Sequence, residues 1–228
     1  MIGDIIDLAF YYSSAGADEL VFYDITASPS NRQVDYKWVS KVAKYINIPF
    51  CVAGGIRTIE SAELILNSGA DKISINTPAI ESPDLIEKLA HRFGSQCVVV
   101  GMDSKKIDNK WIIYKNTGDP NKASKTVLYT LDWIKEVQLR GAGEIVLNCI
   151  SSDGTRNGYD TEQLHAARII SQVPLIASGG AGHSDHFVDL FNQIDVDGAL
   201  AATVFHTKQV KIDELKIYLK SKNINVRV

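Results

Sequence analysis

The sequence predicts an α/β fold, a TIM (βα)8 barrel with a twofold internal repeat. Two observations lead to this fold class. Short apolar runs alternate with amphipathic segments along the whole chain of 228 residues, and such alternation through one domain requires a parallel sheet. The second half of the chain also repeats the first, and two four-stranded halves close naturally into a barrel.

Seven apolar runs are the predicted strands. Each run is continuous in Val, Ile, Leu and Phe instead of alternating with polar residues, which is typical of strands buried on both faces. In chain order the runs are residues 19–25, 48–53, 72–76, 97–103, 144–150, 173–178 and 198–202.

Helices are predicted between these runs. After the first run, Trp38, Val42 and Ile46 recur at helical spacing. Gly69 ends another such segment, and glycine is the usual residue just beyond a helix C-terminus. Residues 104–125 interrupt the alternation and are too long for a plain strand-to-helix loop. We expect a short hairpin and a flexible lid there.

The repeat is clearest at two glycine pairs. Gly54 and Gly55 follow the second run, and Gly179 and Gly180 follow the sixth run, 125 positions later. We therefore expect one barrel domain over residues 1–228, with half-barrels at about 1–94 and 95–228. Two further stretches match their counterparts in the other half: residues 17–28 with 142–153, and residues 70–77 with 196–203.

The repeat requires eight strands, and the sequence offers seven. The counterpart of residues 97–103 would lie before Met1. A barrel that lacks one strand has two unpaired edges and an open core. We therefore expect that the first β-strand is missing from the chain as given, through a misassigned start or a truncation.

Composition limits the classes of function. A formal net charge of −3 and a pI of about 6.0 argue against a nucleic-acid partner. No apolar run approaches the roughly 18 residues of a membrane span, and the N-terminus lacks the features of a signal peptide. Cys51, Cys97 and Cys149 lie far apart in apolar runs. We expect three reduced thiols in a cytoplasmic protein and no metal site.

In a parallel barrel the active site lies at the C-terminal ends of the strands. There, glycine turns let backbone N–H groups face a phosphate, helped by the dipole of the following helix. Two such turns in symmetric positions predict a long substrate with a phosphate at each end. The alternative is that the glycines only permit tight turns. The candidate phosphate-binding residues are Gly54, Gly55, Asn76, Thr77, Ser178, Gly179, Gly180, Ala202 and Thr203.

Carboxylates also occupy these strand ends. Asp103 ends the fourth run and is a natural general acid or base, with a structural capping or pairing role as the alternative. Asp153 and Thr155 follow the fifth run and are candidate substrate ligands. Turn formation is the alternative for Asp153, because its loop is rich in Ser, Gly and Asn. Asp24 and Thr26 follow the first run.

Charged residues begin three of the runs at the opposite end of the barrel. They are Glu19, Lys72 and Glu144, at the first, third and fifth runs. In an eight-strand count all three belong to even-numbered strands, which fill the same layers of a barrel interior. The sequence leaves two readings open: a charged ring that closes the barrel bottom, or side chains that reach solvent.

Seven stretches carry a resemblance to a known family: GADELVFYDITAS, FCVAGGI, GADKISIN, GAGEIVLN, DGTRNGYD, LIASGGAG and DGALAATVFH. With them, the chain resembles the cyclase subunits (HisF) of imidazole glycerol phosphate synthase, a lyase of histidine biosynthesis. The resemblance implies a heterodimer with a separate glutaminase subunit, HisH, whose ammonia travels through the barrel. The implied reaction converts a bis-phosphorylated phosphoribulosyl-formimino-aminoimidazole carboxamide ribonucleotide to imidazole glycerol phosphate and aminoimidazole carboxamide ribotide.

The resemblance also implies roles for residues, without a metal or organic cofactor. Asp103 matches one of the family's two catalytic aspartates, and Asp71 matches a residue at the glutaminase interface. Glu19, Lys72 and Glu144 match members of a charged ammonia gate. The family's other catalytic aspartate and a substrate-positioning lysine belong to its first strand and the following loop. We therefore expect the chain as given to be inactive in cyclisation.

Three alternatives to this reading stay open. The first is the sister isomerase of the same pathway, although DITAS and DGTRNGYD favour the cyclase. The second is a cyclase-like relative that acts in surface-polysaccharide amidation and keeps similar phosphate loops. The third is a truncated, non-catalytic barrel that binds the glutaminase or a phosphorylated ligand. The expected loss of the first strand favours this third reading, whereas Asp103 and the intact glycine turns argue against it.

Overall fold

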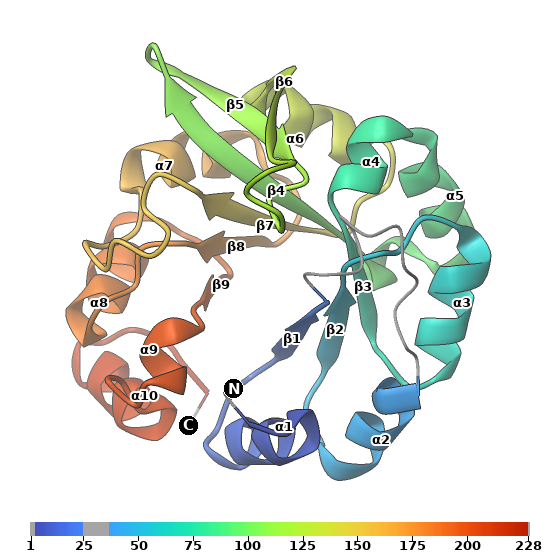
Figure 1. The fold of residues 1–228 in the computed structure, drawn as a ribbon. Helices are drawn as coiled ribbons and strands as arrows, with labels where there is room; N and C mark the ends of the chain where they lie inside the picture. Colours follow the sequence, from blue (N-terminus) through green and yellow to red (C-terminus); the bar gives the residue numbers. More distant parts are fainter. Residues whose placement is uncertain (1–2, 25–36, 228) are drawn as a thin grey trace.

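The computed structural model describes residues 3–24 and 37–227. Within these ranges, one β-sheet curls round with helices on its outer side (Figure 1). The predicted parallel α/β barrel architecture is thereby confirmed, because a strand is found at each of the seven predicted runs. The parallel strands, in their order across the sheet, are β1 (Leu20–Tyr23), β2 (Phe50–Ala53), β3 (Lys72–Ile75), β4 (Val98–Ile107), β7 (Glu144–Cys149), β8 (Leu175–Ser178) and β9 (Gly198–Leu200).

The helices cover the outer face of the sheet with one apolar side each. In α5, Leu85, Ile86 and Leu89 are buried, whereas Glu87 and Lys88 on the other side are exposed. This spacing is that of an amphipathic surface helix. The helices are α1 (Ile5–Ser14), α2 (Lys37–Tyr45), α3 (Ile59–Asn67), α4 (Thr77–Glu81), α5 (Asp84–Phe93), α6 (Thr130–Leu139), α7 (Thr161–Ile170), α8 (Ser184–Gln193), α9 (Thr203–His206) and α10 (Ile212–Ser221), with a 3-10 turn, η1, at Ser95–Cys97.

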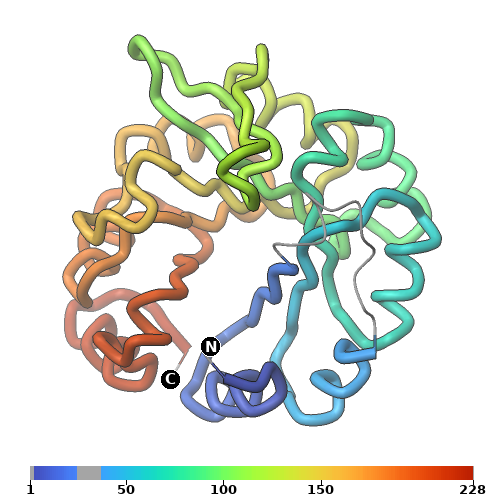
Figure 2. Tube along the Cα trace, viewed as in Figure 1, coloured from blue at the N-terminus to red at the C-terminus, as the bar shows by residue number. Residues whose placement is uncertain are grey.

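Strands β1 and β9 are the two ends of the sheet, and no pairing joins them within residues 3–24 and 37–227. Figure 2 shows the corresponding blue and red segments at the two ends of the curved trace. Side chains connect the elements beside them. The Tyr12 hydroxyl of α1 lies 2.6 Å from Nδ1 of His206 in α9. Asp18, which precedes β1, pairs with Lys216 of α10 at 2.8 Å.

The internal repeat appears in the structure as a pair of matching contacts. Gly54 and Gly179 both have a positive φ, of +104° and +93°. A Cβ atom at Gly54 would lie 2.3 Å from the carbonyl oxygen of Asp24, and one at Gly179 would lie 2.9 Å from that of Cys149. Asp24 and Cys149 are themselves 125 positions apart. Each half therefore builds the same turn, in which a side chain would clash with the preceding strand end.

Strand β4 extends beyond the barrel into an antiparallel hairpin. It pairs with β5 (Lys110–Lys115), which in turn pairs with β6 (Ser124–Tyr129). The turn between β4 and β5 holds Asp108 and Asn109, whose φ angles are 48° and 60°. Two consecutive positive φ angles are what a two-residue type I′ turn requires. The predicted hairpin is confirmed and is longer than expected, whereas the flexible lid stays a prediction.

The core has two parts, because alternate residues of each strand face opposite sides of the sheet. In β7, Ile145 and Leu147 are buried in the main core between sheet and helices. Val146, between them, belongs to a second cluster inside the barrel with Cys51 and Val99. We call this second cluster the inner apolar layer; the partly buried residues packed against it are Val21, Ile176 and Leu200.

Truncating the main core should cost far more than truncating an exposed leucine. Leu147 is fully buried, so Leu147→Ala should lower the free energy of unfolding by about 2–5 kcal/mol. Leu139 is 84% exposed, and Leu139→Ala should change it by less than about 0.5 kcal/mol. Urea unfolding followed by circular dichroism measures both values. Equal losses in the two variants would contradict the assignment of the core.

Candidate functional site

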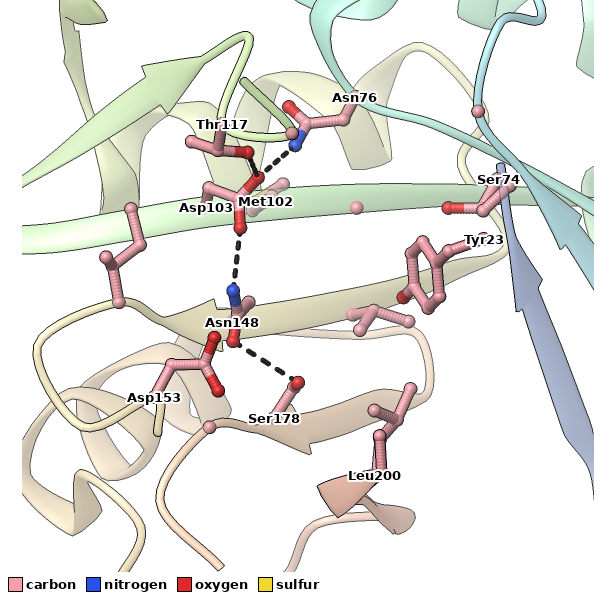
Figure 3. A pocket seen from close by; sticks show the side chains of 18 of the residues that line it. Tyr23, Ser74, Asn76, Met102, Asp103, Thr117, Asn148, Asp153, Ser178 and Leu200 are labelled. Carbon is pink, nitrogen blue, oxygen red and sulfur yellow. Dashed lines mark hydrogen bonds between the residues drawn. The ribbon is translucent and has the colours of Figure 1, made fainter. Parts of the chain in front are cut away.

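A cavity of about 710 Å³ opens at the C-terminal ends of the strands. Both glycine turns border it, and so do polar side chains that lie within or directly after four of the strands: Asn76, Asp103, Asn148 and Ser178 (Figure 3). The structure therefore brings the two halves of the repeat to one site. Of the candidate phosphate-binding residues, all nine line this cavity: Gly54, Gly55, Asn76, Thr77, Ser178, Gly179, Gly180, Ala202 and Thr203.

Asp103 lies at the centre of the polar network in this cavity. Its carboxylate accepts hydrogen bonds from Nδ2 of Asn76 at 2.7 Å, from Nδ2 of Asn148 at 2.7 Å and from Oγ1 of Thr117 at 2.5 Å (Figure 3). Three donors from three different elements fix the orientation of the carboxylate. These contacts hold the carboxylate at the mouth of the cavity, where it can meet a bound ligand.

The amide oxygens of the two asparagines differ in their surroundings. Oδ1 of Asn148 accepts a hydrogen bond from the Ser178 hydroxyl at 3.3 Å. Oδ1 of Asn76 is buried and has no hydrogen-bond partner in the described part of the chain. An unsatisfied buried acceptor is costly. In a site that lines a cavity, it can be satisfied by a donor on a bound ligand.

Two members of this network were not predicted from the sequence. Asn148 is a polar residue inside the apolar run of β7, and that position was a signal for an inward-facing functional side chain. Thr117 follows β5, and its loop also donates the backbone N–H of Asn116 to the Thr77 hydroxyl at 2.9 Å. Only tertiary structure brings that loop back over the strand ends, so spacing in the sequence gave no signal for Thr117.

The loop after β7 places its two candidate ligands differently. Asp153 lines the cavity, where Figure 3 shows it beside Asn148. Thr155 does not line it, and its hydroxyl donates to the carbonyl oxygen of Ser152 at 2.7 Å within the turn. Asp24 lines the cavity from the end of β1, whereas Thr26 lies outside the described residues.

The charged residues at the strand starts meet in one cluster. Nζ of Lys72 lies 2.7 Å from Oε2 of Glu19 and 2.6 Å from Oε2 of Glu144. Burial works to lower the pKa of Lys72, but hydrogen bonds to the two carboxylates outweigh it and hold that pKa above its ordinary value. Burial raises the pKa of Glu144, against the opposing effect of Lys72. The three side chains therefore join one another in one cluster, as the charged-ring reading expected.

The inner apolar layer separates this charged cluster from the cavity. Cys51, in that layer, is 2% exposed, and burial raises the pKa of its thiol well above the ordinary value. Val146 of the same layer also lines the cavity floor. The barrel interior thus runs from charged groups through apolar side chains to polar groups.

Asp71 has a structural contact of its own. Its Oδ2 accepts the backbone N–H of Phe50, at the start of β2, at 3.0 Å. Asp197 makes the equivalent contact in the second half, accepting the N–H of Leu175 at 2.8 Å. A side chain in this position caps the start of the neighbouring strand, and the Asp71 residue remains exposed.

Residues 3–24 and 37–227 offer neither a metal cluster nor a membrane-spanning helix. No group of three or more His, Cys, Asp or Glu side chains there has the arrangement of a metal site. None of the helices in these ranges has the length and apolar character needed to cross a membrane.

Comparisons with known proteins identify the family. A family model described as "Histidine biosynthesis protein" matches residues 1–211. The chain is 57% identical over 227 residues to "Imidazole glycerol phosphate synthase subunit HisF" of Xanthomonas campestris pv. campestris strain B100, an alignment that covers 99% of this chain and 88% of the relative. It is 59% identical, with the same coverage of both chains, to the protein of that name from Xylella fastidiosa strain M12. The chain belongs to the HisF family.

Membership in the HisF family places the chain among the proteins of histidine biosynthesis. Its relatives are named as subunits of an enzyme, and the word subunit implies a partner chain for them. The family resemblance carried by the glycine turns and strand ends is thereby confirmed over almost the whole chain.

Removing Lys72 should make stability depend more steeply on pH. In Lys72→Met, Glu19 and Glu144 face each other without their cation, so the pKa of Glu144 rises further above its unfolded value. The folded state then binds a proton that the unfolded state has lost, and it does so over a wider range of pH. Stability falls as pH rises through that range. We expect a loss of about 1–3 kcal/mol in unfolding free energy near pH 8 and a smaller loss near pH 5.

Urea unfolding at the two pH values measures this difference. Lys88→Met is the matched control, because Lys88 is exposed on α5 and makes no contact with the charged cluster. The same pH-independent loss in both variants would show that the cluster does not couple proton binding to stability.

Proposed function

We propose that this HisF chain is the cyclase subunit of imidazole glycerol phosphate synthase. It converts the bis-phosphorylated phosphoribulosyl-formimino-aminoimidazole carboxamide ribonucleotide, with ammonia, to imidazole glycerol phosphate and aminoimidazole carboxamide ribotide. The observation that carries the proposal is that two equivalent glycine turns and an oriented carboxylate, Asp103, line one cavity. A substrate with a phosphate at each end spans such a cavity with its reacting centre beside the carboxylate.

The proposed roles follow from the contacts of each group. Backbone N–H groups in the turns at Gly54–Gly55 and Gly179–Gly180 bind the two phosphates. Forming a carbon–nitrogen bond from ammonia requires protons to leave the nitrogen, and Asp103 is the group placed to move them. Asn76, Asn148 and Thr117 keep its carboxylate oriented. No metal or organic cofactor is part of this proposal.

The proposed source of ammonia is a glutaminase partner, HisH, at the opposite end of the barrel. Glu19, Lys72 and Glu144 are the proposed gate at that end, and Asp71 is a proposed contact with the partner. Ammonia would pass the inner apolar layer to reach the cavity, and a small neutral molecule crosses apolar surroundings more readily than ammonium. The proposed unit is a single domain over residues 1–228, with its halves at about 1–94 and 95–228.

Because the chain as given is expected to be inactive in cyclisation, the direct test is an assay of the protein purified from its own cells. The bis-phosphorylated substrate is supplied with an ammonium salt at alkaline pH, so that no glutaminase is needed, and both products are quantified by chromatography. We expect both products in equal amounts. Binding of the substrate without turnover would overturn the cyclase proposal and leave the non-catalytic, ligand-binding barrel as the function.

Replacing the Asp103 carboxylate should abolish most of the turnover. Asp103→Asn keeps the shape of the side chain but loses the proton-accepting group, so kcat should fall by about 10²- to 10⁴-fold. Steady-state kinetics with ammonium as the nitrogen source measure the change. Asp195→Asn is the control, because Asp195 is exposed and does not line the cavity. A kcat for Asp103→Asn equal to that of the control would remove Asp103 from the mechanism.

A further inference from the structure

The charge of the cavity does not match a doubly phosphorylated ligand. Three carboxylates line it: Asp24, Asp103 and Asp153. Among the described residues that line it, Arg156 is the basic one. Bringing a phosphate near three carboxylates is unfavourable unless a cation lies close to it. Arg156 is therefore the described side chain best placed to offset this repulsion.

The backbone of Arg156 is held against the second glycine turn. Its φ is +60°, in the left-handed region. A Cβ atom on Gly182 would lie 2.2 Å from the carbonyl oxygen of Arg156, so the two backbones are in close contact. Two residues further on, the N–H of Gly158 donates to the carbonyl oxygen of Gly180 at 2.9 Å. The loop that carries Arg156 therefore packs directly on the turn that follows β8.

The Arg156 side chain is available for a ligand. It makes no hydrogen bond or ion pair in the described structure, and it lines the cavity. Arg57, which follows the first glycine turn, is by contrast paired with a carboxylate. It contacts Glu81 at 3.2 Å, and Lys115 contacts the same side chain at 3.3 Å. A guanidinium without a carboxylate partner, fixed by its backbone beside an anion-binding turn, can present two N–H groups to a phosphate.

We propose that Arg156 binds the phosphate held at the Gly179–Gly180 turn and acts on that end of the ligand only. The identity of the ligand rests on the proposed function. The location of Arg156, on the loop packed against this turn, restricts its reach to one of the two phosphate positions. The arginine thus adds a charge-assisted contact to a turn that otherwise offers backbone N–H groups.

The test measures binding without turnover. Isothermal titration calorimetry gives the dissociation constants of imidazole glycerol phosphate, of aminoimidazole carboxamide ribotide and of inorganic phosphate for each variant. Arg156→Gln should weaken binding of one of the two products by about tenfold or more and leave the other unchanged. Arg156→Lys should retain part of the lost affinity, because it keeps the charge but not the planar fork.

Arg92→Gln is the matched control. It makes the same change of charge on the outer surface, where Arg92 pairs with Glu63, and should bind all three ligands as the unmodified protein does. Equal affinities of Arg156→Gln and Arg92→Gln for both products would overturn the proposal. Equally weakened binding of both products by Arg156→Gln would overturn it too, and so would a failure of the unmodified protein to bind either product. If the protein binds the products but does not turn over the substrate, the cyclase function is contradicted. The comparison of Arg156→Gln with Arg92→Gln then still decides the role of Arg156.

Discussion

The alternation of side chains along each parallel strand is the constraint on which the rest of this structure depends. In β7, Ile145 and Leu147 face the helices, whereas Glu144, Val146 and Asn148 face the barrel interior. One strand of six residues therefore contributes to the charged cluster, to the inner apolar layer and to the network around Asp103. A shift of one residue in pairing register would reverse these positions and lose the core and the site together.

The two halves of the repeat share the same close backbone contact at a glycine. Each half turns its chain at the mouth of the barrel by placing a glycine against a carbonyl oxygen of the preceding strand, at Gly54 and at Gly179. In each half, an aspartate carboxylate, of Asp71 or Asp197, also accepts the backbone N–H of the first residue of a strand. Such paired contacts explain the shared glycines at Gly54 and Gly179 and the shared aspartates at Asp71 and Asp197, where backbone geometry leaves little choice of residue.

The sequence was sufficient to predict the parts of the fold that depend on local pattern. All seven parallel strands and both glycine turns lie where continuous apolar runs and paired glycines placed them. Thr117 could not be found in this way, because it reaches Asp103 through a hairpin whose path depends on tertiary pairing. Thr155 was placed in the site by its position after a strand, but its loop turns the hydroxyl toward Ser152 instead. Proximity in sequence to a strand end therefore does not determine which side chains of a loop enter the cavity.

The hairpin formed by β4, β5 and β6 joins a remote tip to the centre of the site. Its tip, Asp108 and Asn109, is exposed, and β5 runs from there to Lys115, two residues before Thr117. Because β4 and β5 pair from Asp103 to Ile107 and from Lys110 to Tyr114, the position of Thr117 over Asp103 depends on the pairing of the whole hairpin. Substitutions at the tip, far from the cavity, therefore bear on the network around Asp103 through strand pairing and not through direct contact.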